Sequence, residues 1–291
     1  MIRFATVLQS HWDWRAAGNF VLGGTGSALL ALTATQAMVA GRVSPWPTLL
    51  ALALIGAGLG CVWLEIGRPW RALNVFRHPQ RSWMTREGMV GTLVMAAGLA
   101  AAATGSWSLY LAAGALGIAF LYCQARILQA AKGVPTWREP AIVPLIVATG
   151  LAEGSGVLAV LAVAAGRPRW LPFALAVLAL LRWLAWRRYR AGLQAAQAPA
   201  ASQARLAQLD RWLGAGAWVA AALAVATAFA PPPLAPVLLG LAGLAVVAAG
   251  WAMKAAIVTR AAQLQGYAFG RLRHGHPLAH SPTNSTMRTT R

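Results

Sequence analysis

The sequence predicts an all-α integral membrane protein, a bundle of eight transmembrane helices with both termini in the cytoplasm. Of its 291 residues, 58% are hydrophobic and only 11% are charged, a composition typical of a chain that lies in a lipid bilayer. Its apolar stretches reach the ~20 residues needed to cross a hydrocarbon core. Its basic residues gather on one side of the resulting topology, which fixes an orientation.

Eight stretches are long and apolar enough to cross the membrane. They are residues 17–40, 47–66, 87–105, 108–129, 141–165, 169–186, 214–230 and 234–258. Backbone groups in lipid must be paired within their own segment, and no stretch alternates in polarity with period two, so we predict helices and not barrel strands. Small residues recur along them, as in GALG and GLAGLAVVAAG, which allows helix backbones to approach closely.

The lysines and arginines predict the orientation. With eight spans, 22 of the 25 lie on the side of the two termini, and only Arg42, Arg167 and Arg169 lie on the other. The positive-inside rule then puts the termini and the long links in the cytoplasm of a bacterium, with the chain in its cytoplasmic membrane. The net charge of +19 therefore reports topology, and we expect no nucleic-acid partner.

Two segments outside the spans complete the predicted organisation. The link 187–213 ends in ASQARLAQLDRWL, which we predict to be a short amphipathic helix lying at the membrane interface. After the anchor domain, residues 1–269, the basic tail 270–291 lacks an apolar period, and we predict it to be disordered.

The chain lacks the residues that several redox and nucleotide sites require. Its histidines all lie in links or tails: His11, His78, His274, His276 and His280. No facing pair within the spans can therefore hold a membrane haem. Cys61 and Cys123 stand alone in apolar runs, so we predict small core residues and neither an iron–sulfur cluster nor a metal site. No P-loop or GxGxxG motif occurs, and any metal centre must come from a partner.

Two of the six acidic residues stand at the ends of neighbouring spans. Glu65 ends the second and Glu87 begins the third, on either side of the arginine-rich link GRPWRALNVFRHPQRSWMTR. Quinone chemistry moves two protons, so a quinone head group needs a carboxylate or imidazole within hydrogen-bond reach, beside an apolar slot. We therefore expect menaquinone or ubiquinone to bind as an exchangeable substrate near Glu87, Glu65 and His78.

A structural explanation of the same residues stays open. Glu87 begins a helix, where the helix dipole stabilises a negative charge, and Glu65 can pair with Arg68. Trp70 and Trp83 flank the predicted pocket and can either stack on a quinone ring or belong to the aromatic belt at the membrane surface.

Two further ionisable residues lie within predicted spans. Glu153, in LAEGSGV, is near the middle of the fifth span, and charged residues at such depth are retained when they are paired or functional. A proton site and a buried pair with another helix are both open there. Lys254 lies late in the last span, and we expect its long side chain to reach the cytoplasmic interface.

The link between the second and third spans resembles that of the membrane-anchor subunits (DmsC/NrfD-like) of dimethyl sulfoxide reductase-type molybdoenzymes. In that family a Gly-x-Pro turn and a Ser-Trp-x-x-Arg-Glu ending recur between these helices. Here they are Gly67 with Pro69, and Ser82 to Glu87 through Trp83 and Arg86. The eight-span layout, the chain length and the absence of haem histidines are also similar.

The resemblance implies an anchor that exchanges electrons with the quinone pool in anaerobic respiration. It implies a ferredoxin-like iron–sulfur partner and a molybdopterin catalytic subunit, so the chain would be a quinone-interacting subunit and not itself the catalyst. The arginine bias predicts that the docking face for these partners is cytoplasmic. The family's quinol-site glutamate corresponds to Glu87. Its quinol-site histidine corresponds to Glu65, where this chain departs from the pattern, although a carboxylate can also relay a proton.

A narrower resemblance concerns the N-terminal stretch HWDWRAAGNFVLGGTGSALL, which is similar to anchor subunits assigned to phenylacetyl-CoA:acceptor oxidoreductase. A cytoplasmic CoA-thioester substrate agrees with the charge bias. The remaining alternatives are a polytopic proton-coupled transporter that uses Glu153, and a structural anchor without a quinone site.

Overall fold

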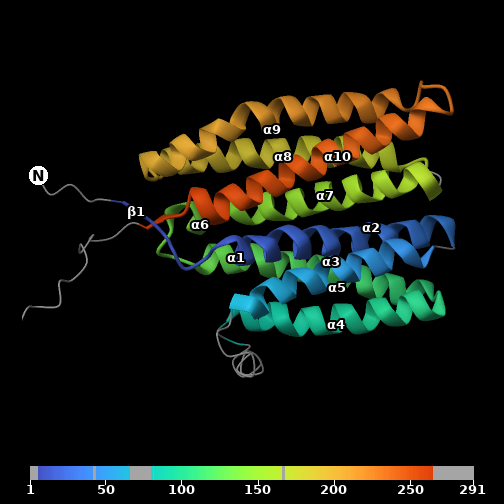
Figure 1. Cartoon of the computed structure of the whole chain (residues 1–291), viewed down its shortest axis with the longest axis horizontal. Helices are drawn as coiled ribbons and strands as arrows, with labels where there is room; N and C mark the ends of the chain where they lie inside the picture. The colour runs from blue at the N-terminus through green and yellow to red at the C-terminus, as the bar shows by residue number, and fades with distance from the viewer. Residues whose placement is uncertain (1–5, 42–43, 66–79, 81, 166–167, 265–291) are drawn as a thin grey trace, which may run out of the picture.

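The computed structural model describes residues 6–41, 44–65, 80, 82–165 and 168–264. Long helices lie side by side along one axis (Figure 1). They are the N-terminal stretch Trp14–Ala40, α3 (Pro45–Glu65), α4 (Trp83–Thr104), α5 (Trp107–Ala130), α7 (Ile142–Ala165), α8 (Leu171–Ala195), α9 (Ala200–Ala226) and α10 (Leu234–Ala255). The N-terminal stretch comprises α1 (Trp14–Gly18), the π-helical turn η1 (Asn19–Gly23) and α2 (Gly24–Ala40).

Seven of these helical stretches have the length and hydropathy to cross a membrane, which confirms a multi-pass helical membrane protein. They are Trp14–Ala40, α3, α4, α5, α7, α9, and α10 continued by the π-helical turn η3 (Ala256–Arg260). The remaining predicted span, the sixth at residues 169–186, corresponds to α8, which is equally long and packs against α7 and α9. Its four arginines lower its hydropathy, so its crossing of the bilayer stays a prediction.

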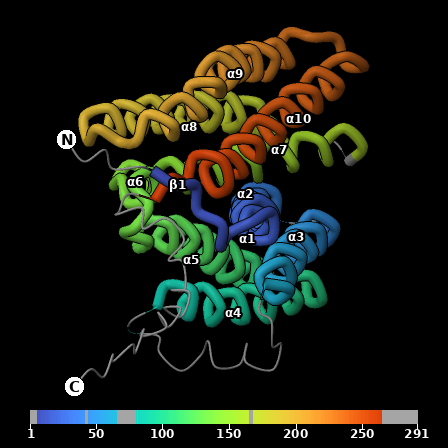
Figure 2. Tube along the Cα trace, turned by 60° about the vertical axis from the view of Figure 1, so that its left-hand side comes forward, coloured from blue at the N-terminus to red at the C-terminus, as the bar shows by residue number. Residues whose placement is uncertain are grey.

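The helix α2 forms the centre of the bundle. It packs against α3, α5 and α7, and Figure 2 shows it enclosed by them. The outer surface carries large exposed apolar side chains, including Leu93 and Leu99 on α4, Phe173 on α8 and Leu244 on α10. A soluble monomer rarely exposes such extended apolar faces, whereas lipid tails cover them in a membrane.

The predicted close approach of helices at small residues is confirmed. A Cβ atom added to Gly156 of α7 would lie 2.6 Å from the carbonyl oxygen of Gly243 of α10, and one added to Gly154 would lie 2.6 Å from the backbone of Ala28 in α2. Packing of this kind replaces the hydrophobic effect as the force that holds helices together in lipid.

Local signals fix several helix ends. Asp13 caps α1 by accepting a bond from the backbone N–H of Arg15, and Ser82 caps α4 by accepting one from Thr85. At the other ends of α2 and α4, Gly41 and Gly105 adopt positive φ values of 70° and 69°, which glycine reaches without steric cost.

One sequence prediction about the connections was wrong, and one feature was not predicted. The segment 187–213 is not a link with a separate interfacial helix, because α8 continues to Ala195 and α9 begins at Ala200 and packs along α8. Ala, Gln and Arg favour helix even where apolar residues thin out. The sequence did not predict a short pair of strands: β1 (Val7–Leu8) pairs antiparallel with β2 (Gln263–Leu264), and the pair joins the two ends of the described chain. The predicted tail, 270–291, lies outside the described residues.

Candidate functional site

Glu87 lies in the first turns of α4 and points into the bundle. It is only 4% exposed, and its Oε1 accepts a hydrogen bond of 2.9 Å from the Nδ2 atom of Asn19 in η1. Gln124 of α5 also interacts with this carboxylate and donates from Nε2 to the backbone carbonyl of Asn19 at 2.9 Å. The carboxylate is thus held by neutral amides, and no ion pair to it occurs among the described residues.

The π-helical turn explains how Asn19 reaches this position. A π turn interrupts the regular α-helical hydrogen-bond register and often marks a functional site. Here it lets the side chain of Asn19 donate to Glu87 while its carbonyl accepts from Gln124. Three helices therefore meet at one buried acid, and the nearby Cys123 is also buried, which confirms that it is a core residue.

A cluster of aromatic and basic side chains lies one turn from Glu87. The guanidinium of Arg86 lies 4.2 Å from the ring centroid of Trp83, and that of Arg126 lies 4.5 Å from the same ring. Tyr122 meets Trp83 edge-on at 5.8 Å and accepts a hydrogen bond from Arg126. Trp83 is therefore fixed between two cations beside the acid, a cation–π arrangement.

Glu65, the second predicted acid, is the last residue of α3 and is half-buried. It interacts electrostatically with Asp13 and Arg15, and Arg15 also donates to the carbonyl of Leu64 at 2.9 Å. The Arg15 side chain, by donating to Asp13, holds the pKa of that carboxyl below its usual value. Glu65 and Glu87 thus both lie against the start of the first helical stretch. The predicted site residues Arg68, Trp70 and His78 lie outside the described residues.

A second polar centre lies deep in the bundle. Glu153 of α7 and Lys254 of α10 are both fully buried and form an ion pair of 2.6 Å. Thr25 of α2 donates to the same carboxylate oxygen at 2.8 Å and accepts from Trp251 at 3.0 Å. The expectation that Lys254 reaches the interface was wrong, because Glu153 is closer and a paired charge costs less in lipid than an unpaired one.

Arg182 of α8 adds a further charge to this centre. Its side chain is 1% exposed and donates from Nη1 to the carbonyl of Val246 at 2.6 Å. It also interacts electrostatically with both Glu153 and Lys254. The second oxygen of Glu153, Oε1, has no hydrogen-bond partner in the described part of the chain.

The two polar centres approach each other at Gly24. A Cβ atom there would lie 2.6 Å from Nζ of Lys254 and 3.1 Å from Oε1 of Gln124. That amide oxygen is buried and has no partner among the residues described. A polar seam therefore runs from Glu87 through Asn19 and Gln124, past Gly24, to Lys254 and its partner acid.

The family comparison rests on residues 16–226, which match the family model described as DMSO reductase anchor subunit (DmsC). The match covers well over half of the chain. The chain belongs to the DMSO reductase anchor subunit family. No curated protein matches it in the search of those proteins, and nothing in the comparisons supports the narrower resemblance to phenylacetyl-CoA:acceptor oxidoreductase anchors.

The matched part of this anchor subunit includes Glu87, Asn19, Gln124 and Glu153, whereas Lys254 lies beyond it. Sequence reasoning found the two acids but missed the amides. A signal for them was present, since Asn19 and Gln124 are neutral polar residues within apolar helices, where an unpaired amide is costly. In the described part of the chain, no group of three or more His, Cys, Asp or Glu could hold a metal ion.

Proposed function

We propose that this anchor subunit passes electrons between an iron–sulfur partner subunit and the quinone pool, and that Glu87 handles a proton of the quinone. The observation that carries the proposal is a carboxylate that is 4% exposed and held by amides. An acid paired with a cation would stay ionised, whereas one held by neutral donors can gain and lose a proton. An anchor of a DMSO reductase also implies a molybdoenzyme partner.

The chemistry divides between the anchor and its partners. Oxidation of a quinol releases two electrons and two protons, and the electrons pass to the iron–sulfur cluster of the partner, which this chain does not supply. Glu87 accepts one proton at its carboxylate while Asn19 holds the acid in place, and the second proton passes to water at the membrane surface. In the reverse direction, both protons return to the quinone. We assign Trp83, fixed by Arg86 and Arg126, to the wall of the pocket beside the acid.

The rest of the predicted pocket stays part of this proposal. We assign to Glu65 the exchange of protons with water at the membrane surface, and its partial burial beside Asp13 and Arg15 supports this role. We assign Arg68, Trp70 and His78 to the same pocket from the sequence pattern. The quinone, menaquinone or ubiquinone, would be an exchangeable substrate.

The orientation is also proposed. The start of α1, the end of α3, the start of α4 and the end of α5 lie at one end of the bundle, together with α6 (Pro135–Arg138) (Figure 1). These are the segments in which the basic residues concentrate. We propose that this end, with both termini, faces the bacterial cytoplasm, and that the ferredoxin-like and molybdopterin subunits dock there. We also propose that α8 crosses the bilayer, which brings the number of spans to eight.

For Glu153 we propose a proton site coupled to Glu87. Lys254 and Gln124 both approach Gly24, so a buried water between them would complete a hydrogen-bonded path from the ion pair to the quinone acid. A transporter would instead require Glu153 to face each side of the membrane in turn, which its bond to Lys254 opposes.

The test is quinol-driven reduction of the iron–sulfur clusters in the purified complex. Glu87→Gln keeps the size of the side chain but removes the proton acceptor, so we expect the rate to fall by about 100-fold or more. Glu139→Gln, at the start of the link to α7, is the matched control. Reduction by a soluble dye should be unchanged in both variants. If Glu87→Gln reduced the clusters with quinol as fast as wild type, the protein would instead be a structural anchor without a quinone site at this position.

A further inference from the structure

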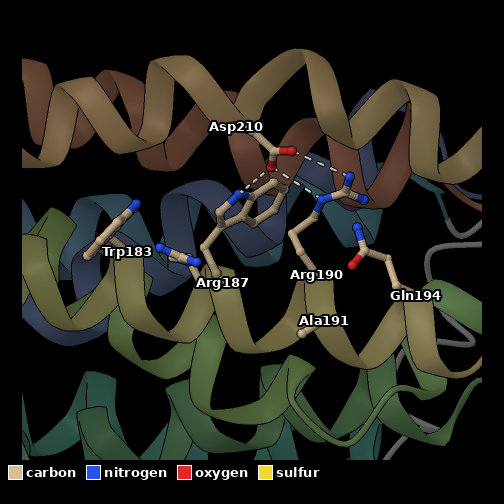
Figure 3. Close-up of a pocket in the computed structure, with 7 residues that line it drawn as sticks. Trp183, Arg187, Arg190, Ala191, Gln194 and Asp210 are labelled. Carbon is tan, nitrogen blue, oxygen red and sulfur yellow. Dashed lines mark hydrogen bonds and ion pairs between the residues drawn. The ribbon is translucent and has the colours of Figure 1, made fainter.

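A pocket of about 400 Å³ lies between α8 and α9, and none of its lining residues belongs to either polar centre. Its lining residues are Trp183, Trp186, Arg187, Arg190, Ala191, Gln194 and Asp210. Figure 3 shows the side chain of Arg190 on α8 reaching Asp210 on α9, and the side chain of Arg187 lying beside Trp183. The pocket therefore combines cations with aromatic rings, at the place where two long helices meet.

Arg190 is the most constrained cation in the pocket. The residue is 9% exposed, and it donates from Nε and Nη2 to the two oxygens of Asp210 at 3.2 and 3.4 Å. Trp186 donates to the same acid at 2.8 Å, so the charge of Asp210 is already offset by two donors. The Nη1 atom of Arg190 is buried and has no hydrogen-bond partner in the described part of the chain. A buried, unpaired guanidinium donor is costly unless a ligand supplies the acceptor.

Arg187 provides a second positive charge. Its guanidinium lies 5.4 Å from the ring centroid of Trp183, and among the described residues no carboxylate forms an ion pair with it. Two arginines against one aspartate leave the pocket with an excess of positive charge. The paired N–H donors of an arginine guanidinium group match the geometry of the oxygens of a phosphate group.

The surroundings indicate the level of the membrane surface. Trp183 meets Trp218 of α9 edge-on at 5.5 Å, and Trp212 and Trp218 are 77% and 55% exposed. Tryptophans gather where head groups meet the hydrocarbon core. On the same helix, Leu184 and Val177 are more than half exposed, as expected of side chains that face acyl chains.

We propose that this pocket binds the phosphate of an anionic phospholipid, with Arg187 and the free Nη1 of Arg190 as its donors and the acyl chains on the apolar surface of α8 and α9. The proposal rests on α8 and α9 both lying in the bilayer, and it is independent of the quinone site. Basic pockets between membrane helices on the cytoplasmic side favour anionic head groups over neutral ones.

The test uses the purified complex in nanodiscs that contain phosphatidylcholine with or without phosphatidylglycerol. Native mass spectrometry should show retained phosphatidylglycerol, and Arg187→Gln should lower its occupancy about fivefold. Arg188→Gln is the matched control, since Arg188 is an exposed neighbour on α8 outside the pocket lining. Because Arg190→Gln would leave Asp210 unpaired, the double variant Arg190→Gln/Asp210→Asn tests Arg190, and it should also lose the lipid.

Other results would overturn the proposal. Equal retention of phosphatidylcholine, or an equal loss of lipid in Arg188→Gln, would show that the pocket is not selective. Binding of inorganic phosphate with no phospholipid retained would show that the pocket holds a free anion and not a lipid head group. Release of the iron–sulfur subunit from Arg187→Gln, with lipid occupancy unchanged, would assign it to an acidic surface of that partner. Quinol-driven electron transfer measured in parallel separates any of these outcomes from failure of the quinone site.

Discussion

The ion pair between Glu153 and Lys254 gives the sharpest prediction about stability. Lys254→Met keeps an unbranched apolar side chain, one atom shorter than that of lysine, but removes the ammonium group. Both partners are fully buried, their N···O distance is 2.6 Å, and Oε1 of Glu153 already lacks a partner among the described residues. Removing one partner of a buried pair costs about 3–5 kcal/mol because the other charge stays uncompensated.

Arg182 decides where in this range the cost falls. It remains close enough to interact with Glu153 after the substitution, so we expect the lower end, about 3 kcal/mol. For a chain of this size, that corresponds to a fall in Tm of about 6–12 °C. Adding Glu153→Gln removes the unpaired charge, and the double variant should recover at least half of the loss.

The assay is thermal unfolding in detergent, read by a thiol-reactive dye that reports exposure of the buried Cys123. The matched control is Lys132→Met, since Lys132 is exposed in the link after α5. Two results would refute the reasoning. One is a Tm for Lys254→Met that equals that of the control; the other is a double variant no more stable than the single one.

Two other predictions concern packing and a helix cap. Gly156→Ala should lower the Tm strongly, because the new methyl group would lie 2.6 Å from the carbonyl of Gly243, whereas Gly216→Ala, where nothing lies within 4 Å, should not; equal effects would contradict close α7–α10 packing. Asp13→Ala should lower the Tm at pH 7. Arg15 holds the pKa of Asp13 below its usual value of about 4. The charged carboxylate therefore stabilises the folded protein fully at pH values above about 4, and this stabilisation is lost as the pH falls through the lowered pKa. The difference between variant and wild type should therefore vanish in acid, and a difference that persists there would argue against the charged cap.

The sequence predicted the membrane bundle because hydropathy and length are local properties of the chain. The spans at Pro45–Glu65 and Leu234–Arg260 differ from their predicted limits by only a few residues. The segment 187–213 was harder, since arginines interrupt its apolar character without interrupting its helix. There, hydropathy and helix propensity point in different directions.

The candidate site was predicted in part for a similar reason. Glu87 and Glu153 stand out as acids in apolar helices, but their partners lie far away in sequence. Asn19 is 68 residues from Glu87, and Lys254 is 101 residues from Glu153. Which faces of two helices meet depends on their rotation within the bundle, and a single sequence does not specify that rotation.

The account depends most on a quinone binding at Glu87, and a titration with a fluorescent quinone analogue tests this directly. In membranes that contain the assembled complex, wild type and Glu139→Gln should bind the analogue equally. Glu87→Gln, which loses the charged acceptor facing Asn19, should bind at least tenfold more weakly, since a hydrogen bond to a charged group contributes about 1.5–3 kcal/mol. Equal binding by all three proteins, with the complex intact, would contradict the account.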